Sequence, residues 1–172
     1  EPKSDKLCSW LQIITACFSS FAHGSNDVAN AIGPLAAINQ ATNQLLNQPY
    51  TLETPLWILF LGATGIVIGL ATLGYRVMKT IGENIVKLTP SKGFSAQLAA
   101  ALTVVIASQL DMPVSTTHTL VGAVIGIGLV EGASTINFNS VRTIVLSWVV
   151  TLPAGALLSI AFLELFTNLF TY

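Results

Sequence analysis

The chain has 172 residues, of which 52% are hydrophobic and 9% charged, and its formal net charge is −1 at pH 7. A soluble domain normally carries about 25% charged residues, so this chain cannot cover a water-facing surface and is expected to be an integral membrane protein. The nearly neutral balance provides no polyanion-binding field and gives no support for a nucleic-acid partner.

The first predicted element is a broken helix over residues 7–40. Its start, Leu7 to Asn26, is free of acidic and basic residues, but polar residues follow from His23 to Asp27, and Pro34 comes soon after. Backbone that leaves a helix inside a membrane is tolerated only where it is buried in protein or lines a polar cavity. We therefore expect a helix break at this point, beside a binding site.

Asp27 is the only acidic or basic residue between Lys6 and Glu53. A carboxylate at membrane depth is costly and is functional by default. With the side-chain oxygens of Asn26 and Asn30, it predicts a site for a hard cation such as Na⁺. The alternative is that these side chains only cap a half-helix. His23 is expected to be structural, with a proton relay as the other interpretation.

Residues 54–75 form a charge-free run that is long enough to span a bilayer. Residues 77–92 follow Arg76 and contain Lys79, Lys87 and Lys92, so this connector is expected on the cytoplasmic side, together with the N-terminus. Apolar residues recur within it at helical spacing, which predicts an interfacial helix lying on the membrane surface. These residues are Val77, Ile81, Ile85 and Leu88.

Residues 93–131 hold two shorter charge-free runs that meet at Asp111 and the sequence Pro-Val-Ser-Thr-Thr-His. We expect a re-entrant helical hairpin with this sequence at its tip, and two full spans as the alternative. Asp111 is expected to cap the turn. A last spanning helix is predicted over residues 142–166, which leaves the C-terminus outside.

The hairpin tip has the composition of an anion site. Pro113 suits the first turn of a helix, so Ser115, Thr116 and Thr117 would lie at a helix start, where backbone N–H groups and hydroxyls face an anion. Ser and Thr also cap many ordinary helices, which is the plain alternative. His118, like His23, is expected to be structural, with a proton relay as the other interpretation.

At these residues the sequence resembles the PiT family of inorganic phosphate transporters. The resemblance is carried by Phe21 to Pro34 and by Pro113 to His118. It continues through further segments of the chain, namely residues 62–90, 91–94 and 146–153. PiT proteins hold two inverted repeats, and this chain is similar to the C-terminal one.

The resemblance implies the fold class: an all-α helical bundle with a broken helix and a re-entrant hairpin, one half of an inverted-repeat transporter. It implies a multi-pass protein of the plasma or inner membrane that takes up phosphate with Na⁺ or H⁺ by alternating access, without a cofactor. The implied partners are the lipid bilayer and the other repeat, and homodimerisation is left open. Phosphate would be bound by Ser115, Thr116 and Thr117 with help from Asn26 and Asp27, and the cation by Asn26, Asp27 and Asn30.

Three alternatives remain at this point. Sulfate has the same tetrahedral shape as phosphate, although only a protonated phosphate can donate a hydrogen bond to an acceptor such as Asp27. Ser115, His118 and Asp111 could be imagined as a hydrolase triad, but no oxyanion motif accompanies them. A purely structural membrane subunit would leave Asp27 unexplained. We therefore expect a transporter and not an enzyme.

Overall fold

The computed structural model describes residues 2–46 and 54–170, and within them every regular element is a helix. Two helices, Leu56–Asn84 and Phe138–Phe170, are long and apolar enough to cross a membrane. The expected all-α membrane fold is confirmed. The chain divides into two units, Glu1–Ile136 and Asn137–Tyr172.

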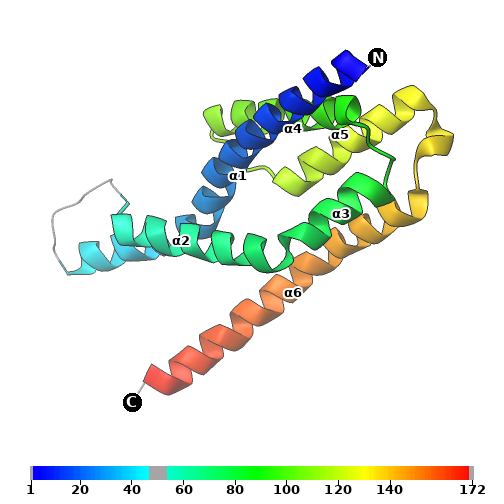
Figure 1. Cartoon of the computed structure of the whole chain (residues 1–172). Helices are drawn as coiled ribbons and strands as arrows, with labels where there is room; N and C mark the ends of the chain where they lie inside the picture. Colours follow the sequence, from blue (N-terminus) through cyan, green and yellow to red (C-terminus); the bar gives the residue numbers. More distant parts are fainter. Residues whose placement is uncertain (1, 47–53, 171–172) are drawn as a thin grey trace. The chain divides into compact units, whose positions relative to one another are not determined.

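Helix α1 (Pro2–Leu45) is continuous, so the predicted break near His23 to Pro34 is wrong. Figure 1 shows instead that α1 changes direction between its blue first half, beside α4, and its cyan end, beside α2. In lipid, a helix that bends keeps most of its backbone hydrogen bonds, whereas a break exposes several N–H and C=O groups. The bend is therefore the less costly of the two.

A proline and two serine hydroxyls within α1 account for its bend. Pro34 lies inside the helix and has no N–H to donate to the Asn30 carbonyl, one turn earlier. The hydroxyls of Ser20 and Ser25 donate to the carbonyls of Ala16 and Ala22, each at 2.9 Å. Such back-bonding from Ser commonly bends helices.

Helix α4 (Pro90–Gln109) runs parallel to the first half of α1 in a fixed register. Thr15 meets Gln97 and Asn26 meets Ser108, and both pairs are 82 residues apart in the sequence. The face of α4 that is buried consists mainly of Gly and Ala, which lets the two backbones approach closely. The buried residues of α4 are Gly93, Ala96, Ala100, Ala101, Val104 and Ala107.

Helix α2 (Leu56–Gly69) continues through the π-helical segment η1 (Leu70–Gly74) into α3 (Tyr75–Asn84). The predicted connector over residues 77–92 is therefore not a separate surface helix, because its first part prolongs the spanning helix and α4 begins at Pro90. Of the predicted apolar face, Ile81 and Ile85 are buried within the first unit, whereas Val77 is exposed.

Helices α4 and α5 (Thr116–Glu131) form a helical hairpin. Leu110 caps α4, and Asp111 adopts a left-handed backbone with φ of 54°. The N–H of Met112 donates to the Ala107 carbonyl at 2.9 Å, and that of Asp111 donates to the Ser108 carbonyl at 3.3 Å. This pair of bonds is a Schellman motif, so Asp111 ends α4 as expected.

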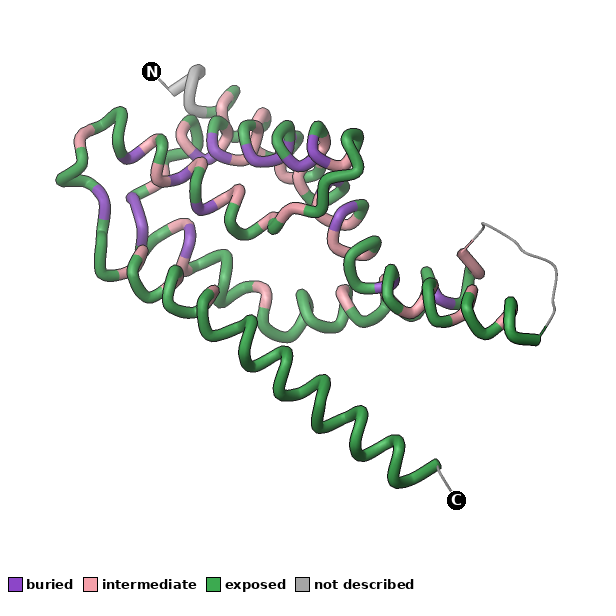
Figure 2. The backbone as a smooth tube through the Cα atoms, turned by 180° about the vertical axis from the view of Figure 1, so that it is seen from behind, coloured by how far each residue is buried: buried purple, intermediate pink, exposed green. Residues whose placement is uncertain are grey.

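Most of the buried residues of the first unit gather where α1, α4 and α5 pack (Figure 2). Helix α5 is followed by a 3₁₀ turn (η2, Ala133–Thr135). In the second unit, α6 (Phe138–Phe170) contains Pro153 and has no buried residue. An apolar helix that buries no residue suits a lipid-facing or partner-facing position.

Candidate functional site

Asp27 on α1 meets the start of α5. The Thr116 hydroxyl donates to Asp27 Oδ2 at 3.1 Å, and His23, one turn earlier on α1, places Nε2 2.6 Å from the same oxygen. The Asp27 side chain is 31% exposed. Asp27 Oδ1 lies 3.3 Å from the Asn26 amide nitrogen in the orientation described below. A carboxylate has about four acceptor positions on its two oxygens, so Oδ1 still has a position for a ligand.

Asn26 is buried, with 5% of its surface exposed, and its side chain contacts the hairpin tip. With its amide nitrogen toward the Val114 carbonyl, the two atoms lie 2.7 Å apart, and the amide oxygen accepts from Ser108 Oγ at 3.3 Å. This orientation follows from the neighbouring hydrogen-bonding groups. The Asn30 side chain lies 3.0 Å from the same amide, one turn further along α1.

Ser115 is the N-cap of α5. Its hydroxyl accepts from the His118 backbone N–H at 3.3 Å and lies 2.7 Å from His118 Nδ1. The Thr119 N–H donates to the Ser115 carbonyl at 3.1 Å. The N–H groups of Thr116 and Thr117 are in the first turn, where an α-helix provides no partner within itself. These two donors form the positive end of the helix dipole.

The structure brings most of the predicted residues together without the predicted helix break. Asn26 and Asp27 are neighbours on α1, Asn30 lies one turn further along, and Asp27 reaches Thr116. Asn30 and Thr117 are exposed. Because α1 is continuous, it lacks the row of free backbone carbonyls that a helix break would expose. The Asn30 carbonyl alone loses its helix hydrogen bond, because Pro34, one turn later, has no N–H to donate.

Ser108 and the Val114 carbonyl were missed in the sequence analysis as partners of Asn26. Ser108 lies 82 residues from Asn26, and its only signal in the sequence was a polar residue near the end of a charge-free run. The Ser115 and His118 side chains face each other, with Ser115 Oγ 2.7 Å from His118 Nδ1. Their contact belongs to the N-cap of α5.

Two hollows in the described part of the chain lie away from these residues. One, of about 550 Å³, lies between α4 and α5 and includes Lys92 and Glu131. The other, of about 460 Å³, lies between α1 and α2 and includes Ser25 and Leu59. Neither of these two hollows contains Asp27 or Thr116.

Comparisons with known proteins identify relatives along nearly the whole chain. A model of the phosphate transporter family matches residues 1–159. A candidate phosphate permease of Chlamydia pneumoniae is 53% identical over 92% of this chain and 36% of its own length. The chloroplastic inorganic phosphate transporter 2-1 of Arabidopsis thaliana is 47% identical over 96% of this chain and 28% of its own.

A solved structure described as the sodium-dependent phosphate transporter is similar in fold, with a TM-score of 0.69 and 45% identity. The match covers 83% of this chain and 35% of that one. The chain spans about a third of the length of the relatives it matches. These relatives are named as permeases and transporters, which argues against the hydrolase alternative.

Proposed function

Because the chain belongs to the phosphate transporter family, we propose that it supplies one half of a cation-coupled inorganic phosphate transporter. The observation that carries this proposal is the hydrogen bond between Thr116 and Asp27. It joins a helix that carries a carboxylate at membrane depth to a helix start that offers N–H and hydroxyl donors. Such a junction suits a cation and an anion bound side by side.

The cation site is proposed at Asp27, Asn26 and Asn30. Asp27 supplies the negative charge, and the Asn30 carbonyl supplies an oxygen freed by Pro34. Na⁺ favours such hard oxygen ligands, and the name of the solved structure, a sodium-dependent transporter, supports Na⁺ ahead of H⁺. No cofactor is required for this chemistry.

The phosphate site is proposed at the start of α5, on Ser115, Thr116 and Thr117, with help from Asn26 and Asp27. The first-turn N–H groups and the helix dipole favour an anion. Asp27 Oδ1 can accept a hydrogen bond from a protonated phosphate, whereas sulfate has no proton to donate. The position of Asp27 beside Thr116 therefore favours phosphate over sulfate.

The mechanism that we propose is alternating access by movement of the α4–α5 hairpin against the spanning helices. Helix α5 has 16 residues, about 24 Å of helix, which is shorter than a hydrocarbon core of about 30 Å. A re-entrant hairpin therefore fits better than two spans. A bound cation offsets the phosphate charge, so each ligand raises the affinity for the other.

The complete transporter is proposed to need a second, inverted repeat facing this one, in a plasma or inner membrane with the N-terminus cytoplasmic. The relatives are long enough to contain such a repeat, since this chain covers 36% to 40% of the bacterial ones. Homodimerisation of the assembled transporter would be a further level of association.

The proposal is tested by uptake of labelled phosphate into proteoliposomes holding the assembled transporter, with Na⁺ and pH gradients imposed separately. We expect uptake that depends on the Na⁺ gradient and that excess sulfate does not inhibit. Uptake driven by the pH gradient alone would replace Na⁺ by H⁺. Equal inhibition by sulfate would mean a general tetrahedral-anion permease, and no uptake under either gradient would refute transport.

The anion site is tested by replacing Ser115, Thr116 and Thr117 together with Ala. This triple variant should lose phosphate affinity, with a smaller loss in thermal unfolding temperature. Unchanged affinity would mean that these side chains only cap α5.

A further inference from the structure

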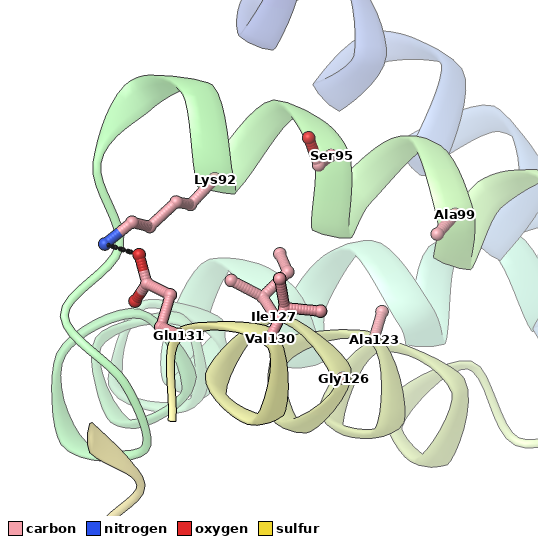
Figure 3. A pocket seen from close by; sticks show the side chains of 8 residues that line it. All are labelled: Lys92, Ser95, Ala99, Ala123, Gly126, Ile127, Val130 and Glu131. Atoms are coloured by element: carbon pink, nitrogen blue, oxygen red, sulfur yellow. Dashed lines mark ion pairs between the residues drawn. The ribbon is translucent and has the colours of Figure 1, made fainter. Parts of the chain in front are cut away.

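Lys92 and Glu131 form an ion pair at the open end of the hairpin, at the opposite end of α5 from Thr116. Lys92 Nζ lies 2.5 Å from a Glu131 carboxylate oxygen, and the side chains are 28% and 31% exposed. Figure 3 shows the pair bridging the start of α4 and the end of α5. The pair lies outside the proposed ion sites.

Each charge lies at the end of its own helix where the dipole disfavours it. Lys92 is in the first turn of α4, and Glu131 is the last residue of α5. Cations are stabilised at helix C-termini and anions at N-termini. In the hairpin, however, Lys92 lies beside the C-terminus of α5 and Glu131 beside the N-terminus of α4. The favourable electrostatics therefore exist only while the two helices lie side by side.

Next to this pair, a hollow lies between the facing surfaces of α4 and α5. The hollow has a volume of about 550 Å³, and half of the residues that line it are small. Figure 3 labels Ser95 and Ala99 on α4 and Ala123 and Ile127 on α5 among the residues that line it. Along this stretch the hollow leaves the ion pair as the specific polar contact between the two helices, whereas Val121 and Val124 of α5 are buried nearer the tip.

We propose that the Lys92–Glu131 pair is a positioning latch, which holds α5 at a fixed register along α4 and so keeps Thr116 within reach of Asp27. Helix α5 acts as a rigid rod of about 24 Å between the latch and the tip, so a shift at Glu131 is passed to Thr116. The consequence for transport depends on the proposed function, because neither latch residue touches the proposed ligands.

The test uses Lys92→Gln, Glu131→Gln and the charge-swapped double variant K92E/E131K in the assembled transporter. Each single variant should raise the KM for phosphate about fivefold, the size expected for one partly exposed ion pair, with little change in maximal rate. Backbone hydrogen exchange at residues 112–119 should speed up by a similar factor. The swap retains the pair and should restore both measurements. Lys87→Gln, which neutralises an exposed lysine of the preceding connector, should change neither.

The outcomes separate the latch from the proposed function. If the unmodified protein takes up no phosphate, the transport proposal fails, while the exchange measurement still tests the latch. If the single variants exchange at the unmodified rate, or if the swap fails to restore slow exchange, the latch is refuted even in a protein that transports phosphate. An equal effect of Lys87→Gln would also refute it, by showing a general response to lost positive charge.

Discussion

Replacing Asp27 with Asn separates the charge of this side chain from its shape. The new side chain keeps an oxygen that can accept from the Thr116 hydroxyl, now 3.1 Å from Asp27. The contact between α1 and α5 should therefore persist, and the variant should insert and fold. The substitution removes the negative charge offered to the cation and replaces the second carboxylate oxygen with an amide nitrogen.

The size of the effect follows from the electrostatics of the site. Two unit charges about 4 Å apart interact by about 4 kcal/mol at an effective dielectric constant of about 20. The Asp27 side chain is 31% exposed, and solvent screening of that kind reduces the interaction to roughly 2 kcal/mol. That free energy corresponds to about 30-fold weaker cation binding.

The measurement is the Na⁺ concentration that gives half-maximal phosphate uptake in proteoliposomes, normalised to inserted protein. The matched control is Asp111→Asn, the same chemical change on the hairpin tip. Asn tolerates the left-handed backbone at this position, so this control should behave as the unmodified protein. The reasoning would be refuted if Asp27→Asn kept its Na⁺ dependence or if both variants lost it equally.

Two other substitutions test the contact and the packing that supports it. Thr116→Val keeps the side-chain shape but removes the donor to Asp27, and a hydrogen bond to a charged group is worth about 1.5–3 kcal/mol; phosphate binding should weaken about tenfold, and unchanged binding would remove Thr116 from the site. Gly62→Ala should lower stability by about 1–3 kcal/mol, because its Cβ would clash with the stiff, branched Ile32 side chain. Gly65→Ala, where nothing lies within 4 Å, should not lower the unfolding temperature in detergent, and an equal loss in both variants would contradict this packing.

The helical membrane fold could be predicted because the positions of charged residues, and the long runs without them, can be read directly from the sequence. Long runs without Asp, Glu, Lys or Arg can be buried in lipid only as helices that satisfy their own backbone. The turn at Asp111 was predictable for the same reason, since a charge followed by Pro113 interrupts such a run. These features depend on local sequence and need no knowledge of distant contacts.

The predicted break in α1 failed because the sequence shows the cause of a distortion but not its size. Pro34 removes one backbone donor and Ser25 competes for one carbonyl, and both effects are compatible with a break or a bend. The choice depends on what packs around the helix. Here α4 supports the first half of α1 and α2 supports its end, so a bent helix is stabilised along its length.

The partners of Asn26 were unpredictable for a different reason. The parallel register of α1 and α4 places Ser108 opposite Asn26, but the small residues that permit this approach would also allow a neighbouring register. A register is fixed by the sum of many contacts, among them Thr15 with Gln97. No single residue in the sequence carries that information.

The exposure of the site residues gives a physical reason to expect a facing repeat. Asn26 is 5% exposed and its amide has partners on α4 and at the hairpin tip. Asn30 on α1 and Thr117 on α5 are exposed. Polar groups at membrane depth need partners that lipid cannot supply. A second repeat, inverted with respect to this one, would cover these groups with its own donors and acceptors and close the site around both ions.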